Sequence, residues 1–362
     1  MRPIRVSLAS IVIFLLCIGI VMIYSSSGIY ALQELGDSAY FLNRHLLFLC
    51  VGTCLTLGVM TIDYRDLKKW AKPLLGVAVL LLVLVLIPGI GKSISGARRW
   101  FQVAGFSFQP SEFAKLALLI YVSDYLSRKQ SKIGDFFKGF LPVILILGMM
   151  CLLVIKQPDF GSSVLMAVIV MILLFLGGAR PAHLGSLALL AVPVAVMLVA
   201  KSPYRMARIL AFLDPWQDSR GIGFQLTQSQ IAFGSGGFWG VGLGKSVQKL
   251  FYLPAAHTDF ILSIIGEELG FIGASLVIFL FVAFIWQGAR MAKRTTDPFG
   301  YYLASGIVAM VGFQAAINIG VSIGALPTKG LPLPFVSYGG SALIFNMIAV
   351  GILLNISRVQ DL

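Results

Sequence analysis

Long apolar runs, each close to the length of a membrane-spanning helix, recur along almost the whole chain. A helix needs roughly 20 apolar residues to cross the hydrocarbon core of a bilayer, because unpaired backbone groups are not tolerated there. The runs are apolar on all sides rather than alternating, which favours helices over the strands of a membrane barrel. They predict about ten spans, near residues 8–25, 45–62, 73–88, 110–127, 139–155, 161–178, 184–200, 258–287, 300–323 and 341–357.

The basic residues between these runs indicate how the chain is threaded. Lysine and arginine accumulate at the cytoplasmic ends of membrane helices, and the densest clusters fall on one side if the spans alternate. We expect that side to be the cytoplasm, and an even number of spans puts both termini there. The opposite side then carries a large extracytoplasmic loop between spans 7 and 8, at about residues 201–257.

The first apolar run follows Arg2 and Arg5 and could be mistaken for a signal peptide. It is not followed by a cleavage site of the small-x-small type, and span after span comes behind it. We therefore expect it to be retained as the first helix.

Composition agrees with this pattern and narrows the class of protein. Hydrophobic residues make up 58% of the 362 positions and charged residues only 12%, whereas about a quarter of a soluble domain is charged. The net charge of +13 fits the positive-inside bias and attraction to anionic lipid, and no soluble basic domain exists to hold nucleic acid. The sequence predicts an all-α polytopic membrane protein that forms a single transmembrane domain over residues 1–362.

Charged residues at the ends of the runs are candidate functional positions, because charge near membrane depth is costly. Glu112 and Lys115 follow Pro110 and are three residues apart on one helix face, close enough to pair. They are either a neutralised pair that pins two helices together or part of a site at the outer end of the span. Asp159 lies between Pro158 and Gly161, where it either caps the next helix or serves function.

A third polar segment runs directly into the eighth predicted span. Thr258 or Asp259 is a candidate N-cap, and a carboxylate at a helix N-terminus is stabilised as the anion unless desolvation offsets this effect. His257 is either a proton partner of Asp259 or an interfacial side chain. Further along, Glu267 and Glu268 are consecutive in sequence and cannot both face one partner.

The chain lacks the motifs of several large enzyme classes. It has no Walker A lysine loop, no HExxH motif and no Asp-x-Asp motif, so neither ATP nor a cytosolic nucleotide-sugar is the expected energy source or donor. Outward-facing carboxylates and basic side chains suit a lipid-linked substrate with an anionic head, because a carboxylate can take a hydroxyl proton and a cation can balance phosphate. A transporter could use the same groups, and the residues alone do not decide between an enzyme and a transporter.

Taken together and in order, the polar motifs are similar to those of the SEDS family (shape, elongation, division and sporulation), and the resemblance extends over essentially the whole chain. Its motifs are Gly96-Ala97-Arg98-Arg99-Trp100, residues 108–115, Gln157-Pro158-Asp159-Phe160-Gly161, Phe212-Leu213-Asp214-Pro215-Trp216, residues 248–254, His257-Thr258-Asp259-Phe260, residues 264–270 and residues 327–341. The stretch 248–254 and Gly266 resemble the division branch more than the rod-elongation branch. Two departures concern outer loops: Ser95 stands where many relatives carry Asn, and Ala255 stands where division-type members commonly carry Glu.

The resemblance implies an activity. Family members polymerise lipid II into glycan strands at the outer face of the cytoplasmic membrane, at the septum in the division branch. They act with a class B penicillin-binding protein that crosslinks the strands, and with other divisome membrane proteins. The resemblance implies no cofactor with certainty; a divalent cation such as Mg²⁺ or Mn²⁺ could bridge the pyrophosphate to a carboxylate, but the sequence shows no dedicated metal site.

The resemblance also implies roles for individual residues. Asp259 matches the essential aspartate and is the expected general base in an inverting transfer that releases undecaprenyl pyrophosphate. Lys115 is expected to support Asp259 electrostatically, and Glu112 is expected to be a third catalytic residue beside these two. The expected substrate-binding residues are Arg98, Arg99, Asp159, His257, Lys329 and Ser341, with the two arginines as candidates for the pyrophosphate. The alternatives are a lipid II flippase, a rod-elongation polymerase and a non-catalytic scaffold.

Overall fold

The computed structural model describes residues 1–94, 97–103, 106–250 and 252–359. Ser95, Gly96 and Phe251, which belong to the motifs and departures above, lie outside the described residues. Helices dominate: α1 Arg2–Leu35, α2 Tyr40–Thr61, α3 Leu67–Leu84, α4 Pro110–Lys129, α5 Leu141–Lys156, α6 Phe160–Leu176, α7 Pro181–Ala200, α8 Pro203–Leu213, α9 Phe224–Gly236, α10 Ile261–Arg294, α11 Pro298–Ser322 and α12 Gly340–Val359.

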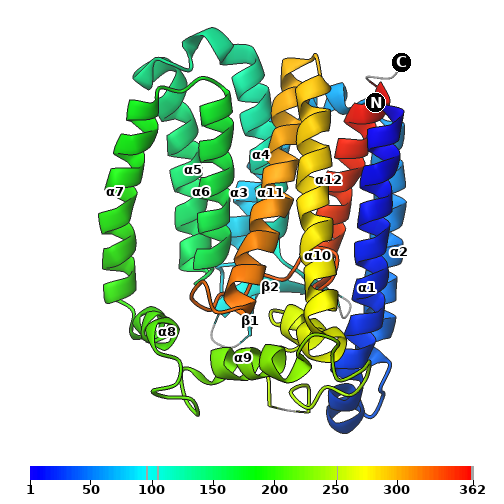
Figure 1. Ribbon diagram of the computed structural model, residues 1–362. Helices are drawn as coiled ribbons and strands as arrows, with labels where there is room; N and C mark the ends of the chain where they lie inside the picture. Colours follow the sequence, from blue (N-terminus) through cyan, green and yellow to red (C-terminus); the bar gives the residue numbers. More distant parts are fainter. Residues whose placement is uncertain (95–96, 104–105, 251, 360–362) are drawn as a thin grey trace.

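The long helices run side by side in one bundle, as Figure 1 shows. Each of the ten predicted spans overlaps one of them, namely α1 to α7 and α10 to α12, with ends that differ by several residues. Seven helices in the described part of the chain are long and apolar enough to cross a membrane, and α6 is apolar but shorter. The start of α1 and the end of α12 lie at the same end of the bundle (Figure 1), which is called the terminal end below.

Two features at the opposite end, called the site end, differ from the expectation of an all-α protein. A three-stranded antiparallel sheet, β1 Lys92–Ile94, β2 Ala97–Val103 and β3 Phe106–Phe108, occupies the connection between α3 and α4. Its strands satisfy each other's backbone groups outside the helices. The expected large loop is also not a plain loop, because it contains α8 and α9, and α9 lies across the bottom of the bundle in Figure 1.

Glycine allows the site end of the bundle to pack closely. Gly270 breaks the helical course of α10 with a φ of 68° and a ψ of −164°, a conformation that disfavours any side chain. The backbone of Gly240 approaches so closely that a Cβ on Gly270 would lie 2.4 Å from its nitrogen. The chain that follows α9 is thereby pressed against the first part of α10.

Candidate active site

A cavity of about 380 Å³ opens at the site end of the bundle, and Asp259 is one of its lining residues. The walls come from segments that are far apart in sequence: α2, the sheet, the turn before α10, and the loop between α11 and α12. Besides Asp259, the lining residues with polar side chains are Arg44, Arg99, Trp100, Ser107, Gln109, Thr258 and Tyr338. The cavity therefore combines a carboxylate with cationic and neutral hydrogen-bonding groups.

Asp259 is held in a turn immediately before α10 rather than in the helix. Its backbone N–H donates to the carbonyl of Ala255 at 3.1 Å, and its own carbonyl accepts from Asn318 Nδ2 at 2.8 Å. Neither Asp259 nor Thr258 caps α10; the N-cap position is Phe260, without a side-chain cap. The two candidate caps named from the sequence are thus not caps, and the Asp259 carboxylate is left for the cavity.

Asn318 on α11 connects this turn to the loop across the cavity. The amide of this buried side chain donates a second hydrogen bond, to the carbonyl of Leu331 at 2.8 Å. Gly330, one residue earlier, faces the carboxylate so closely that a Cβ there would lie 3.2 Å from Asp259 Oδ2. The absence of a side chain at Gly330 therefore leaves room beside the carboxylate.

The surroundings of Asp259 shift its proton affinity. Desolvation by burial raises the pKa of Asp259 to about 6, although the positive charges of Arg208 and Arg99 act in the opposite direction. A carboxylate with this pKa is still largely ionised at neutral pH but is a better base than an exposed aspartate. The arrangement suits proton removal from a hydroxyl group.

Three cations approach Asp259 or the loop beside it. Arg99 on β2 donates from Nε to the carbonyl of Gln157 at 2.8 Å, and its NH2 group donates to the carbonyl of Pro158. Arg208 on α8 donates from NH1 to the carbonyl of Thr328 at 2.9 Å. Next to Thr328, Lys329 Nζ lies 5.0 Å from the ring centre of Phe160, and burial together with repulsion from Arg208 lowers the pKa of Lys329.

Glu112 and Lys115 pair, as their spacing predicts, but they lie beneath the cavity rather than in its lining. Their side chains are 4% and 1% exposed, and Lys115 Nζ lies 2.9 Å from Glu112 Oε1. Lys115 also donates to Gln314 Oε1 at 3.1 Å, and Gln314 Nε2 donates to the carbonyl of Pro332 at 3.0 Å. The side chain of Gln314 thus links the Glu112–Lys115 pair to Pro332, which lines the cavity.

Asp159 has the capping geometry that its position allows. Its Oδ1 accepts from the backbone N–H of Ser162 at 3.1 Å, and its Oδ2 accepts from the Ser162 hydroxyl at 2.7 Å. Gln109 Nε2, which belongs to the cavity lining, also donates to Oδ2 at 3.2 Å. Asp159 therefore fixes the beginning of α6 and orients a side chain of the cavity, without lining the cavity itself.

Ser341 and His257 support the walls. The Ser341 hydroxyl accepts from the backbone N–H of Gln109 and donates to the carbonyl of Ser107, both at 3.0 Å. His257 packs among Tyr30, Phe41 and Tyr338, and burial lowers its pKa to about 4. The packing favours the interfacial role of His257 over that of a proton partner.

Arg98 does not take part in the cavity. It is exposed and outside the lining, whereas the next two residues of β2, Arg99 and Trp100, both line the cavity. In the described part of the chain, no group of three or more histidine, cysteine or acidic side chains could hold a metal ion. Among the described residues, Asp259 is the only carboxylate in the lining, and one carboxylate alone does not form a metal site.

Several residues of the site were not singled out from the sequence. In the sequence, Arg208 is one of several basic residues of the long loop, and its spacing of three from Arg205 is the signal of a shared helix face. Gln314 and Asn318 lie one turn apart within α11. As uncharged polar residues inside an apolar run, they are typical of groups that bond across helices.

Comparisons with known proteins show which family the chain belongs to. The sequence profile of the FtsW/RodA/SpoVE family, described as "Cell cycle protein", matches residues 6–362. The chain is 48% identical over 361 residues to the probable peptidoglycan glycosyltransferase FtsW of Trichlorobacter lovleyi, covering 98% of this chain and 95% of the relative. It is 45% identical over 351 residues to stage V sporulation protein E of Bacillus subtilis, covering 97% and 96%.

Solved structures show the same fold. A chain from the study "Structural coordination of polymerization and crosslinking by a peptidoglycan synthase complex" matches with a TM-score of 0.78 and 30% identity, covering 96% of this chain and 97% of that one. The rod shape determining protein RodA of Thermus thermophilus matches with a TM-score of 0.73 and 28% identity, covering 98% and 96%. The chain belongs to the FtsW/RodA/SpoVE family, which is the SEDS family that its motifs resemble.

Proposed function

We propose that this protein is a peptidoglycan glycosyltransferase of the division type, which polymerises lipid II into glycan strands. The observation that carries the proposal is the position of Asp259, whose carboxylate faces a cavity together with Arg99 and has a pKa raised to about 6. The names of relatives in the FtsW branch support the reaction class. An exposed, hydrated aspartate would be a much weaker base.

In the proposed reaction, Asp259 acts as the general base. Its carboxylate takes the proton of the acceptor sugar's 4-hydroxyl, and the oxygen attacks the anomeric carbon of the donor. The bond from that carbon to the pyrophosphate oxygen breaks, the configuration inverts, and undecaprenyl pyrophosphate leaves. Arg99, Arg208 and Lys329 balance the charge of the leaving group, whereas the buried Glu112–Lys115 pair positions the cavity wall through Gln314.

The proposal includes an arrangement in the membrane. Ten helices cross the bilayer, the terminal end faces the cytoplasm, and α8, α9 and the sheet lie on the outer side with the cavity. The polar cavity then meets a substrate whose lipid tail stays in the bilayer. We place the protein in the bacterial cytoplasmic membrane at the division septum, with a class B penicillin-binding protein and other divisome membrane proteins as partners. The match to a chain of a peptidoglycan synthase complex supports the first of these partners.

Polymerisation in detergent tests the catalytic proposal directly. The purified protein, together with its crosslinking partner, is incubated with lipid II, and glycan products are separated by size. We expect long strands from the wild type and none from Asp259→Ala. The proposal is wrong if no polymer forms, or if Asp259→Ala polymerises as well as the wild type.

The same assay separates polymerisation from lipid II translocation. Detergent removes the two membrane sides that a flippase requires, so a protein that only moves lipid II produces no glycan in it. A rod-elongation polymerase would be active in the assay, and depletion in cells separates this alternative: loss of a division enzyme gives filaments, whereas loss of an elongation enzyme gives rounded cells.

A further inference from the structure

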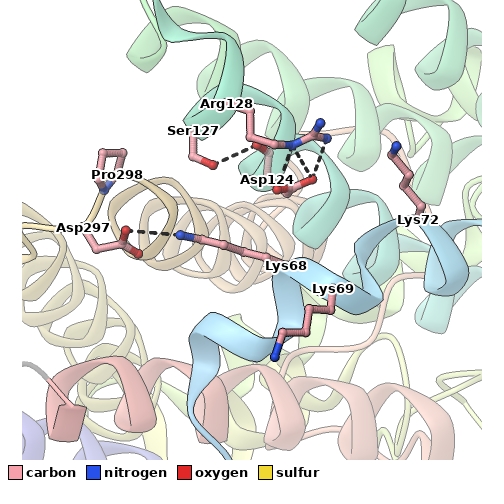
Figure 2. A pocket seen from close by; sticks show the side chains of 8 residues that line it. All are labelled: Lys68, Lys69, Lys72, Asp124, Ser127, Arg128, Asp297 and Pro298. Carbon is pink, nitrogen blue, oxygen red and sulfur yellow. Dashed lines mark hydrogen bonds and ion pairs between the residues drawn. The ribbon is translucent and has the colours of Figure 1, made fainter.

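A second cavity, of about 530 Å³, lies at the terminal end of the bundle, far from the candidate active site. It is an open pocket bordered by the beginning of α3, the end of α4 and the beginning of α11 (Figure 2). Its charged lining residues are Lys68, Lys69, Lys72, Asp124, Arg128 and Asp297. None of them belongs to the proposed catalytic machinery.

The two carboxylates of this basic pocket are already engaged. Asp124, whose side chain is 6% exposed, receives a forked pair of contacts from Arg128, with NH2 at 2.7 Å from Oδ2 and Nε at 3.0 Å from both oxygens. Asp297 caps α11 by accepting from the backbone N–H of Gly300 at 3.0 Å, and Lys68 Nζ lies 3.4 Å from its other oxygen. The acidic groups therefore face inward.

The cationic groups are the accessible ones. The Arg128 side chain remains 47% exposed despite its ion pair, and the Lys69 side chain is 78% exposed while it contacts Asp66 at 2.7 Å. Lys72 is exposed, and among the described residues it has no ion pair or hydrogen bond. The described lining carries four cations and two anions, a net charge of +2 that falls to +1 when Asp66 beside Lys69 is included, so the pocket remains positive.

Exposed aromatic side chains indicate that the pocket lies at the depth of lipid headgroups. Trp70, between Lys69 and Lys72 on α3, is 61% exposed, and Phe137, in the π-helical segment Phe136–Phe140 before α5 at the same end, is 74% exposed. Exposed tryptophan is typical of the membrane interface. Because Trp70 and the lysines share the first turns of α3, the cations occupy the level at which phosphates of the leaflet are found.

We propose that this pocket binds the headgroup of an anionic phospholipid from the leaflet at the terminal end. The phosphate is held by Lys72, Lys69 and the exposed side of Arg128, and the acyl chains extend along the apolar outer surface of α3. A lipid is favoured over a soluble anion because the membrane supplies it at high local concentration, and basic pockets between helix ends suit anionic headgroups. The bound lipid would tie α3, α4 and α11 together at this surface.

Native mass spectrometry of the purified full chain in a nonionic detergent tests the proposal. Phosphatidylglycerol and phosphatidylcholine are added separately, and the retained lipid is counted. We expect retention of phosphatidylglycerol only, about fivefold weaker in Lys72→Gln and restored in Lys72→Arg. Lys132→Gln is the matched control, because Lys132 is exposed at the same end and outside the pocket lining; its retention should match the wild type.

Four results of this experiment would contradict the binding of an anionic phospholipid. An equal loss in Lys72→Gln and Lys132→Gln would overturn the proposal, because general surface charge would then account for binding. Retention of phosphatidylcholine as strong as that of phosphatidylglycerol would do the same. Displacement of the lipid by inorganic phosphate at equal concentration would assign the pocket to a soluble anion, and displacement by an acidic peptide but not by phosphate would assign it to a protein partner. Thermal unfolding without added lipid confirms that each variant is folded.

Discussion

Lys249 Nζ lies 2.7 Å from Glu268 Oε1, and the two side chains are 3% and 0% exposed. Ser25 on α1 donates to both oxygens of the same carboxylate, at 2.8 and 2.7 Å. The neighbouring Glu267 accepts instead from the backbone N–H of Val247 at 2.9 Å and from the hydroxyl of Ser246. The two consecutive glutamates thus have different partners, and both attach the segment before the turn of Asp259 to α10.

Removing Lys249 should loosen this segment. Lys249→Met leaves Glu268 buried without its counter-charge, and breaking a buried pair costs about 3–5 kcal/mol. We expect a lower unfolding temperature and faster proteolysis between α9 and α10. Lys245→Met is the control, because Lys245 is exposed in the same segment. Equal stability of the two variants would show that the pair does not hold the segment.

The Glu112–Lys115 pair should behave as a coupled unit. Glu112→Gln and Lys115→Met each leave one buried group uncompensated, so each should lose about 3–5 kcal/mol of stability and most of the polymerase activity. The double variant should recover a large part of the stability, because both charges are gone. A double-mutant cycle by thermal unfolding measures this coupling, and strictly additive losses would argue against the pair.

Polymerisation should depend on pH through Asp259. With a pKa of about 6, the base is ionised above that value, and the rate should fall about tenfold per pH unit below it. Single-turnover polymerisation between pH 4.5 and 8 measures the profile. A rate that stays constant down to pH 4.5 would contradict the role of Asp259 as base.

The same carboxylate should make the protein less stable at neutral pH. Because the pKa of Asp259 in the folded state is raised above its ordinary value of 3.8 to about 6, its stabilising contribution is present below pH 4 and is lost as the pH rises through 6. Asp259→Asn should therefore unfold at a higher temperature than the wild type at pH 7 while polymerising at least about 100-fold more slowly. A variant that is both inactive and less stable would indicate a structural role instead.

Gly330 should control the space beside the Asp259 carboxylate. In Gly330→Ala the new Cβ lies 3.2 Å from Asp259 Oδ2, so the carboxylate must shift by a few tenths of an ångström. We expect kcat to fall about tenfold with little change in unfolding temperature. Gly76→Ala on α3 is the control, because nothing lies within 4 Å of its added Cβ. Unchanged kcat in Gly330→Ala would show that the carboxylate position is not critical.

The sequence by itself determined the long apolar helices and some local polar contacts, but it did not predict α8 and α9 within the long loop. The ten predicted spans each overlap a helix because the length of an apolar run is a local property. The pairing of Glu112 with Lys115 and the capping by Asp159 could also be predicted from the sequence, because each partner lies three residues away. The small sheet was missed, since its pairing joins short strands without a clear alternation of polar and apolar residues.

Only the tertiary structure decided which distant residues meet. Arg99, Arg208 and Gly330 come from different parts of the chain, and no periodicity predicts that they surround Asp259. The exclusion of Arg98 from the cavity that Arg99 lines likewise depends on how β2 lies against the cavity. The pKa of Asp259 follows from its burial among these elements. Burial depends on how the helices pack, and the sequence leaves the packing open because many arrangements of the same apolar helices would bury similar surfaces.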